Sequence, residues 1–210
     1  NVWKSVDGGA TWTGPTVITT NIGAVFHDKP YLAVDQSAGT YSGAMYVTWT
    51  RLTGVANDCN TYTEAPVWLA RSADGGATWQ TQRISTSVNS QGSVPAVGPD
   101  GTLYVAYLDY VGAIDVVTST NGGLSFGTQR QATGVVVLPY SLPGSAFPVN
   151  SFPSIAVSPV NGYVYVAWAD YRTGDADIYL TKSTDRGASW SAPRRLNDDA
   201  QGNGNDQFFP

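Results

Sequence analysis

Acids, tyrosines and arginines of this chain follow short apolar runs, where they could bind a ligand or take part in acid–base or nucleophilic chemistry. Carboxylates act as general acids, bases or nucleophiles, and arginine can hold a carboxylate through two parallel hydrogen bonds. Asp109 and Asp170 are equivalent, because each ends a run of the type Tyr-Val-Ala-aromatic-x-Asp. The catalytic candidates are Asp28, Arg51, Asp109, Asp170 and Arg172, and the binding candidates are His27, Tyr110 and Tyr171. Capping of strand ends is the competing interpretation of the same acids.

Two further groups have side chains that could do chemistry. His27 is the only histidine and could form an acid–base pair with Asp28, the alternative being a solvated loop histidine. Asp175 and Asp177 form an Asp-x-Asp pair ahead of an acidic C-terminal loop. Oxygen ligands of this kind suit Ca²⁺, so a structural calcium ion is one interpretation and a solvated acidic turn is the other. No other cofactor is expected.

An octapeptide of the type Ser-x-Asp/Asn-x-Gly-x-x-aromatic recurs along the chain and sets its organisation. The copies are SVDGGATW (5–12), SADGGATW (72–79), STNGGLSF (119–126) and STDRGASW (183–190). Three short runs rich in β-branched and aromatic residues precede each of the last three copies, and another run follows it. Four-stranded units that recur every 45 residues or so are typical of the blades of a β-propeller.

The residue types of the octapeptide predict a tight hairpin. Glycines tolerate positive φ, the Asp or Asn accepts hydrogen bonds from backbone N–H groups of its own turn, and the aromatic ring can fold back onto the blade. One copy carries Asn121 in place of Asp, and an amide cannot act as a carboxylate acid, base or nucleophile. The predicted structural residues are Ser5, Asp7, Gly9, Trp12, Ser72, Asp74, Gly76, Trp79, Ser119, Asn121, Gly123, Phe126, Ser183, Asp185, Gly187 and Trp190.

The octapeptides and the runs between them resemble the Asp-boxes, or bacterial neuraminidase repeats, of the sialidase superfamily. The wider pattern DKPYLAVD, MYVTWTR, VAWADYR and RLNDD…NDQFFP is most similar to secreted bacterial exo-sialidase-like proteins. The resemblance implies an all-β propeller with the Asp-boxes on the strand 3–4 turns, away from the ligand face. It also implies glycoside hydrolase chemistry as the activity of the family, and an extracellular or cell-surface location in a bacterium.

The resemblance does not extend to the full catalytic machinery. Sialidases use arginines that clamp the sugar carboxylate, a Tyr nucleophile supported by Glu, an Asp acid/base and usually an early Phe/Tyr-Arg-Ile-Pro motif, which this sequence lacks. Arg51 and Arg172 could supply two arginines of the clamp, whereas Glu64 lies in an inserted loop. We therefore expect no glycosidase turnover from these residues alone. The alternative function is a non-catalytic extracellular propeller that binds glycans or protein, or builds a surface assembly.

The repeats predict a single partial propeller over residues 1–210, taken from a ring of roughly six to eight blades. The expected blades cover approximately 1–20 (partial), 27–86, 93–132, 151–196 and 206–210 (partial). Because open sheet edges invite pairing, the remaining blades of the same chain or a second copy would complete the ring. A glycan or protein ligand is expected on the face of the strand 2–3 loops and strand 4–1 connections, where the insertions 51–65 and 131–150 lie.

Composition limits the class of protein and of partner. The chain has 210 residues, of which 42% are hydrophobic and 13% charged, so it can bury a sizeable core. Its net charge of −5 argues against nucleic acid as a partner, because nucleic-acid binding requires a basic surface. No apolar run approaches the length of a membrane span. Cys59 has no second cysteine with which to form an intrachain disulfide.

Overall fold

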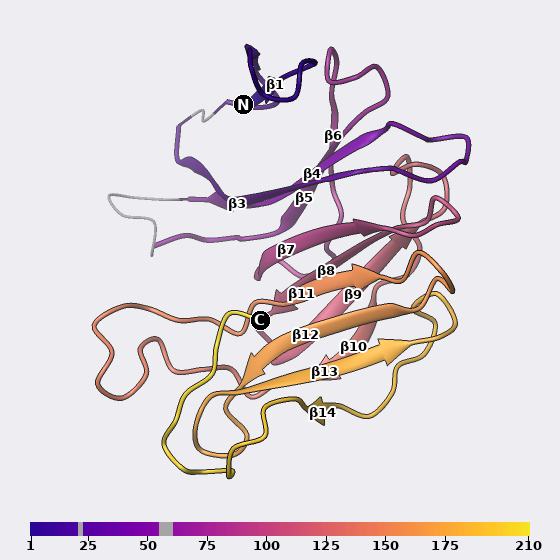
Figure 1. Cartoon of the computed structure of the whole chain (residues 1–210). Coiled ribbons are helices and arrows are strands. Elements are labelled where there is room, and N and C mark those ends of the chain that lie inside the picture. Colours follow the sequence, from indigo (N-terminus) through magenta and orange to yellow (C-terminus); the bar gives the residue numbers. More distant parts are fainter. Residues whose placement is uncertain (21–22, 55–60) are drawn as a thin grey trace.

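The computed structural model describes residues 1–20, 23–54 and 61–210 and consists of antiparallel sheets joined by turns and loops (Figure 1). Three sheets have four strands each, paired in chain order, and a two-stranded sheet precedes them. No helix of the described residues is long and apolar enough to cross a membrane. The observed architecture is therefore the all-β one that the repeats predict, with three complete four-stranded blades.

Each blade is a meander of neighbouring strands. The partial sheet pairs β1 (Val2–Lys4) with β2 (Thr13–Thr16). The first full blade contains β3 (Val25–Val34), β4 (Met45–Thr53), β5 (Val67–Ser72) and β6 (Gln80–Arg83). The second contains β7 (Ser90–Val97), β8 (Leu103–Asp109), β9 (Ala113–Ser119) and β10 (Arg130–Gly134). The third contains β11 (Ser154–Val157), β12 (Val164–Asp170), β13 (Asp177–Ser183) and β14 (Arg194–Arg195).

The blades pack face to face, which explains why the central strands are apolar on both sides. Every residue of β8 is buried, because one face packs on the first blade and the other on the third. Tyr46 and Leu69 of the first blade share a core cluster with Val105 of β8. Leu108 of the opposite β8 face shares another cluster with Trp168 of β12. Burial of this kind is the main stabilising contribution in a propeller.

The Asp-box turns form a repeated hydrogen-bonded unit between the third and fourth strands. In one copy the Ser72 hydroxyl donates to Asp74 at 2.8 Å and accepts from the Gly76 N–H at 2.9 Å. Asp74 also accepts from the Thr78 N–H at 2.9 Å. The Trp79 indole N–H donates back to the Gly76 carbonyl at 3.1 Å. The side chains of Ser72, Asp74 and Trp79 thus hold their own turn, which faces away from the starts of the first strands.

The first strands β3, β7 and β11 lie side by side at the inner edge of the blades (Figure 1). Two of them carry an irregularity at an equivalent place: the pairing of β3 shifts between Asp28 and Tyr31, and that of β7 shifts between Gln91 and Val94. A bulge bends its strand and redirects side chains. These bends position the residues of the candidate site.

Candidate functional site

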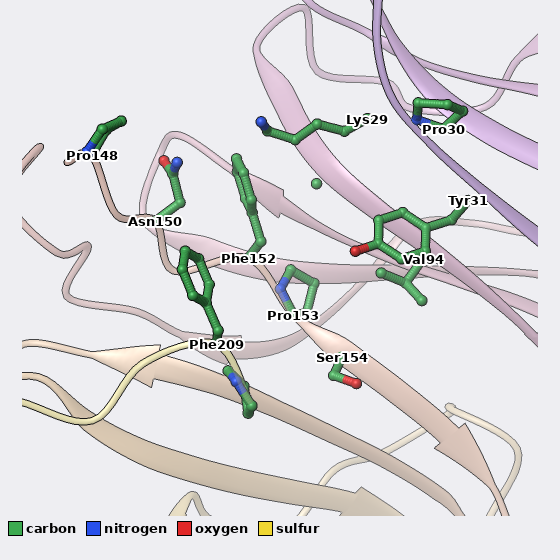
Figure 2. Close-up of a pocket in the computed structure, with 12 residues that line it drawn as sticks. Lys29, Pro30, Tyr31, Val94, Pro148, Asn150, Phe152, Pro153, Ser154 and Phe209 are labelled. Carbon is green, nitrogen blue, oxygen red and sulfur yellow. The ribbon is translucent and has the colours of Figure 1, made fainter.

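A pocket of about 620 Å³ lies where the starts of β3, β7 and β11 meet the C-terminal residues (Figure 2). We call it the axial pocket, because first strands surround the axis of a propeller. It is lined by apolar rings and a few polar groups, as is usual for small-molecule sites. The lining residues are Lys29, Pro30, Tyr31, Gly92, Val94, Pro148, Asn150, Phe152, Pro153, Ser154, Phe209 and Pro210.

The wall of the axial pocket depends on two unusual backbone positions. Lys29 has a φ of 50°, a left-handed conformation that is uncommon for a residue with a side chain. Its ammonium lies 5.5 Å from the centre of the Phe152 ring and 3.6 Å from the Asp28 carboxylate. Gly92 has a φ of 65°, and a Cβ there would lie only 2.3 Å from Phe152 atoms. The ring of Phe152 therefore occupies space that only glycine leaves free.

A polar rim borders the axial pocket on the side of Tyr110. The hydroxyl of Tyr110 donates to Asn150 at 3.5 Å, and the Gln91 amide donates to Tyr62 at 3.3 Å. Burial raises the pKa of Tyr110 to about 12, and the fields of Tyr62 and Asp28 add to this effect. A phenol with a raised pKa is a poor nucleophile, since activation requires a lowered pKa or an adjacent base. The arrangement suits hydrogen bonding to a polar ligand.

Asp170 and Arg172 form an internal ion pair. The Asp170 side chain is fully buried, and the Arg172 guanidinium donates to it at 2.6 Å and 2.9 Å. The Trp168 indole N–H also donates to Asp170 at 2.9 Å. Arg172 lies over the Tyr179 ring at 4.5 Å, and its pKa is raised by the hydrogen bonds to Asp170. The structure therefore places this arginine in the third blade, outside the lining of the axial pocket.

The other predicted residues take separate positions. Arg51 lies over the Trp68 ring at 5.0 Å and is not among the residues that line the axial pocket. Tyr171 packs on the core cluster of Leu138 and Ala169. Within the insertion 51–65, Glu64 is exposed and forms an isolated bridge with Thr53, whereas residues 55–60 lie outside the described residues.

His27 lies within β3, where its neighbours fix its proton. The Trp49 indole N–H donates to Nδ1 of His27 at 2.8 Å, so Nε2 carries the proton, 3.4 Å from the Thr19 hydroxyl. Burial lowers the pKa of His27, and Arg51 contributes to the lowering. Successive strand residues point to opposite faces, so His27 and Asp28 do not face each other. The side chain lines a separate pocket of about 490 Å³ beside β4.

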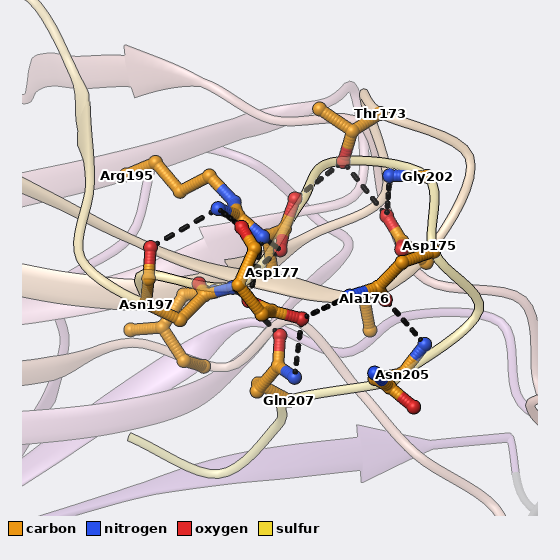
Figure 3. A network of polar contacts seen from close by, with 12 residues as sticks. Thr173, Asp175, Ala176, Asp177, Arg195, Asn197, Gly202, Asn205 and Gln207 are labelled. Carbon is orange, nitrogen blue, oxygen red and sulfur yellow. Dashed lines mark hydrogen bonds and ion pairs between the residues drawn. The ribbon is translucent and has the colours of Figure 1, made fainter.

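The Asp175–Asp177 pair is surrounded by donors (Figure 3). Asp177 accepts from Arg195 and Asn197, both at 2.6 Å, and Asp175 accepts from the N–H groups of Gly202 and Gly204. These contacts tie the C-terminal loop to the third blade. The described residues contain no group of three or more His, Cys, Asp or Glu side chains that could hold a metal ion.

The structure brings together some predicted residues and adds others that sequence reasoning missed. Asp28 and Tyr110 lie near the axial pocket, on the face expected for a ligand. Lys29, Asn150, Phe152 and Phe209 were missed as site residues. A signal existed in the Pro that follows Lys29, Phe152 and Phe209, in DKP, FPS and FFP. Such a motif indicates a bend but does not reveal that three bends converge.

Comparisons with known proteins support this fold. No known protein-family profile matches the chain. A xyloglucanase from Paenibacillus sp. is 29% identical over 206 residues, which cover 90% of this chain and 18% of the relative. The structure is similar to that of the intramolecular trans-sialidase from Ruminococcus gnavus, with a TM-score of 0.64, 14% identity and coverage of 94% of this chain and 64% of that one.

A second solved structure, the Hadza microbial sialidase Hz136, has a TM-score of 0.61 and 18% identity, with 90% of this chain and 39% of the sialidase covered. The chain therefore spans less than a fifth of the xyloglucanase and about two-fifths of this sialidase. At these identities the likeness to solved structures concerns the fold. The chain is a partial β-propeller with the fold of the sialidases.

Proposed function

We propose that this chain belongs to a bacterial, extracellular or cell-surface propeller related to glycoside hydrolases, and that it binds carbohydrate at the axial pocket without turning it over. The observation that carries the proposal is the composition of that pocket. The exposed rings of Tyr31 and Phe209 and the half-buried ring of Phe152 surround it, with Lys29 and Asn150 as polar groups. Aromatic faces together with hydrogen-bonding side chains suit the apolar faces and hydroxyl groups of a sugar ring.

The similarity to a xyloglucanase and to sialidases supports a carbohydrate ligand. It does not identify the sugar, because these relatives act on different carbohydrates according to their names. The net charge of −5 repels an acidic sugar, whereas the ammonium group of Lys29 attracts it. Neutral and acidic oligosaccharides therefore need to be compared directly.

The proposal of binding without turnover rests on the hydrogen-bond partners and the pKa of the candidate catalytic side chains. Arg172 is bound to Asp170, and the pocket lining contains no arginine that could clamp a sugar carboxylate. Tyr110, the tyrosine of the polar rim, has a raised pKa, which opposes its use as a nucleophile. These groups stabilise the blades and the rim.

Binding is tested by titrating the chain with xyloglucan oligosaccharides and with sialyllactose and following backbone amide shifts. We expect saturable shifts around β3, β7 and β11 for one of these ligands. Phe152→Ala should weaken that binding by about fivefold, because it removes an aromatic contact worth about 1 kcal/mol. Val160→Ala, at a remote turn where the side chain is 91% exposed, serves as the matched control. Equal affinity in the Phe152 variant, or the absence of saturable shifts, would contradict the proposal.

Turnover is tested separately with a fluorogenic sialoside and a fluorogenic xyloglucan substrate. The expected rate equals that of buffer. Substrate release that disappears in Tyr110→Phe would show that the chain is catalytic and that the second half of the proposal is wrong.

A further inference from the structure

The second and third blades begin the turn after their second strand in the same way, although residues 110–112 form this turn in the second blade and residues 171–176 form it in the third. Asp109 accepts a hydrogen bond from the N–H of Val111 at 3.2 Å, and Asp170 accepts one from the N–H of Arg172 at 3.0 Å. The two aspartates end β8 and β12 at equivalent places. The third blade therefore carries a cation two residues after its aspartate, and the second blade carries valine.

The cation of the third blade fills a defined space. The Arg172 guanidinium lies between the buried Asp170 carboxylate and the ring of Tyr179, and it also donates to the Gly134 carbonyl at 3.0 Å. Tyr179 lies opposite Trp168 in the β12–β13 pairing. The same register in the second blade pairs Tyr107 with Asp115. A second carboxylate thus takes the place of the tyrosine ring.

Asp109 and Asp115 are 4% and 5% exposed, so this blade buries two carboxylates side by side. The Asp109 side chain accepts from the Ser87 hydroxyl at 3.1 Å, and Asp115 accepts from the Gln129 amide at 2.7 Å. Burial raises the pKa of Asp115, and its close approach to Asp109 raises it further. Neither carboxylate belongs to an ion pair among the residues that the structure describes. Two buried carboxylates with neutral donors alone are costly.

Two buried hydroxyl groups beside the carboxylates also lack partners. Tyr107 and Ser90 are fully buried, and neither side-chain oxygen has a hydrogen-bond partner among the described residues. Ser90 lies opposite Asp109 and Tyr107 opposite Asp115, and residues directly opposite in a sheet point to the same face. Both hydroxyls can accept a hydrogen bond. This face of the sheet therefore carries both carboxylate and hydroxyl oxygens that can accept further hydrogen bonds.

A surface pocket opens onto the carboxylates where the third blade has its arginine. Its volume is about 630 Å³, and its lining includes Asp109, Asp115 and Val111. Gln129 and Gln131 complete the polar part of the wall. The Val111 side chain is 84% exposed and does not cover the opening. Space and charge thus coincide at one place, which we call the Asp109–Asp115 pocket. The hydroxyls of Tyr107 and Ser90 are buried on the same face of the sheet, outside the lining of this pocket.

We propose that the Asp109–Asp115 pocket binds a guanidinium group supplied by a ligand, in the position that Arg172 takes in the third blade. A planar guanidinium has five N–H donors and pairs with carboxylates through two bonds. The group could come from a small free guanidine or from the arginine side chain of a peptide. This site lies apart from the axial pocket, so the proposal does not depend on carbohydrate binding.

Two probes identify the source of the group: methylguanidinium and the tripeptide acetyl-Gly-Arg-Gly-amide, titrated at millimolar concentrations while backbone amide shifts are followed. We expect saturable shifts at Val111, Asp115 and Gln129. Equal affinity for both probes indicates a free guanidine, and a tripeptide that binds at least tenfold more tightly indicates an arginine side chain. Acetyl-Gly-Lys-Gly-amide has the same charge without the planar group and should bind at least fivefold more weakly.

Substitutions of residues that line the Asp109–Asp115 pocket test the same proposal. Val111→Arg recreates the third blade, so it should abolish probe binding and raise the melting temperature by about 3 °C. Val111→Ala is the matched control and should bind the probe as the natural chain does. Asp115→Asn removes one charge at constant shape and should weaken probe binding at least tenfold.

Three results would overturn the proposal. These are the absence of saturable shifts with either guanidine probe, unchanged probe binding in Asp115→Asn, and shifts produced by calcium chloride but not by the probes. If Asp115→Asn raises the melting temperature while no probe binds, the two carboxylates share a proton and hold no ligand. None of these results affects the glycan titration, which reports on different amides.

Discussion

At the residue scale, the aspartate of the Asp-box accepts hydrogen bonds from its own turn and so has a structural role. Asp74 accepts from the hydroxyls of Ser72 and Thr78 and from the Thr78 N–H. These bonds, led by that from the Thr78 side chain, lower the pKa of Asp74 well below its ordinary value. In the third copy of the octapeptide, Asn121 accepts from Ser119 and Ser125 in the same way. The turn requires an acceptor at this position and not a charge.

Asp74→Ala should lower the melting temperature by a few degrees, because it removes three hydrogen bonds to the turn. Asp74→Asn should retain most of the stability, since Asn121 performs the same task elsewhere in the chain. Thermal unfolding followed by circular dichroism measures both changes. An Asp74→Ala variant with unchanged melting but altered ligand binding would contradict the structural role of this residue.

The lowered pKa values of the Asp-box acids also set a pH dependence. Hydrogen bonds from Thr11 and from Ser189 hold the pKa of Asp7 and of Asp185 at about 2. A carboxyl with a lower pKa in the folded than in the unfolded state stabilises the fold above the unfolded value of 3.8 and loses this effect as the pH falls toward 2. The box acids therefore give little pH dependence above about pH 4.

His27 sets the pH dependence of stability at a higher pH than the Asp-box acids do. Its pKa is lowered by burial, so the unfolded chain binds a proton more readily than the folded chain. The contribution of neutral His27 is complete above the unfolded value of 6.5 and is lost as the pH falls through the folded pKa. We expect the melting temperature to fall between pH 7 and pH 5 in the natural chain and to fall less in His27→Gln. A parallel decrease in both chains would show that the Trp49–His27 contact has no such effect.

At the scale of the elements, β12 and β13 are held together by a buried charge as well as by their backbone ladder. Asp170 lies opposite Asp177 in the pairing, and both carboxylates are fully buried. Arg172 neutralises one, and Arg195 from β14 neutralises the other. Two acids at one strand end are tolerated because each has its own guanidinium. The second blade has Val111 and Gln131 at the equivalent places, so Asp109 and Asp115 have no arginine partner among the described residues.

Arg172→Ala should lower the free energy of unfolding by about 3 kcal/mol, because it leaves the Asp170 charge buried without a partner. The double variant Asp170→Asn/Arg172→Ala should recover a large part of this loss, because a buried amide is far cheaper than a buried carboxylate. Urea unfolding measures both. A double variant that is less stable than the single one would show that Asp170 is held mainly by Trp168 and the backbone.

At the scale of the whole molecule, apolar surface remains where the partial sheet meets the first blade. Trp3 and Trp12 of the partial sheet are 53% and 59% exposed, and Leu32 of β3 is 54% exposed. Contiguous apolar surface of this kind marks an interaction site. The predicted occupants are further blades of the same chain or a second copy, and each would bury the rings as blade faces do inside the stack.

The chain should therefore associate with itself at micromolar concentrations, which sedimentation velocity can measure. Trp3→Lys should shift the equilibrium toward the 22.2 kDa monomer, because it places a charge in the contact. Val6→Lys, at a side chain that is 86% exposed in the Asp-box turn, is the matched control. A chain that stays monomeric at high concentration would exclude a second copy as the partner.

The repeats predicted the class of fold because they encode local structure. Each octapeptide contains its own donors and acceptors, as Ser72, Asp74 and Gly76 show, so its turn needs no distant partner. A strand with one buried face alternates apolar and polar residues, and a strand with two buried faces is a continuous apolar run. Local hydrogen bonds and the period of hydrophobic residues are both visible in a linear sequence.

The candidate site was predicted less well, for a physical reason. The sequence predicted a ligand face and the candidates Asp28 and Tyr110 near the axial pocket, but not that Phe152 and Phe209 line this pocket. These rings converge from segments 57 residues apart, because the bends of β3 and β7 and the start of β11 lie close together. Arg172 was a candidate for binding a sugar carboxylate, but in the structure its guanidinium is hydrogen-bonded to Asp170.

By itself the sequence determined the four-stranded units, their turns and the absence of a basic surface, since each follows from residues close together in the chain or from their totals. Only the tertiary structure decided which charges have partners. Asp109 and Asp170 end nearly identical runs, yet one meets a second carboxylate and the other an arginine. Pairing across strands depends on register, and register is fixed by the packing of whole blades and not by the residues adjacent to each acid.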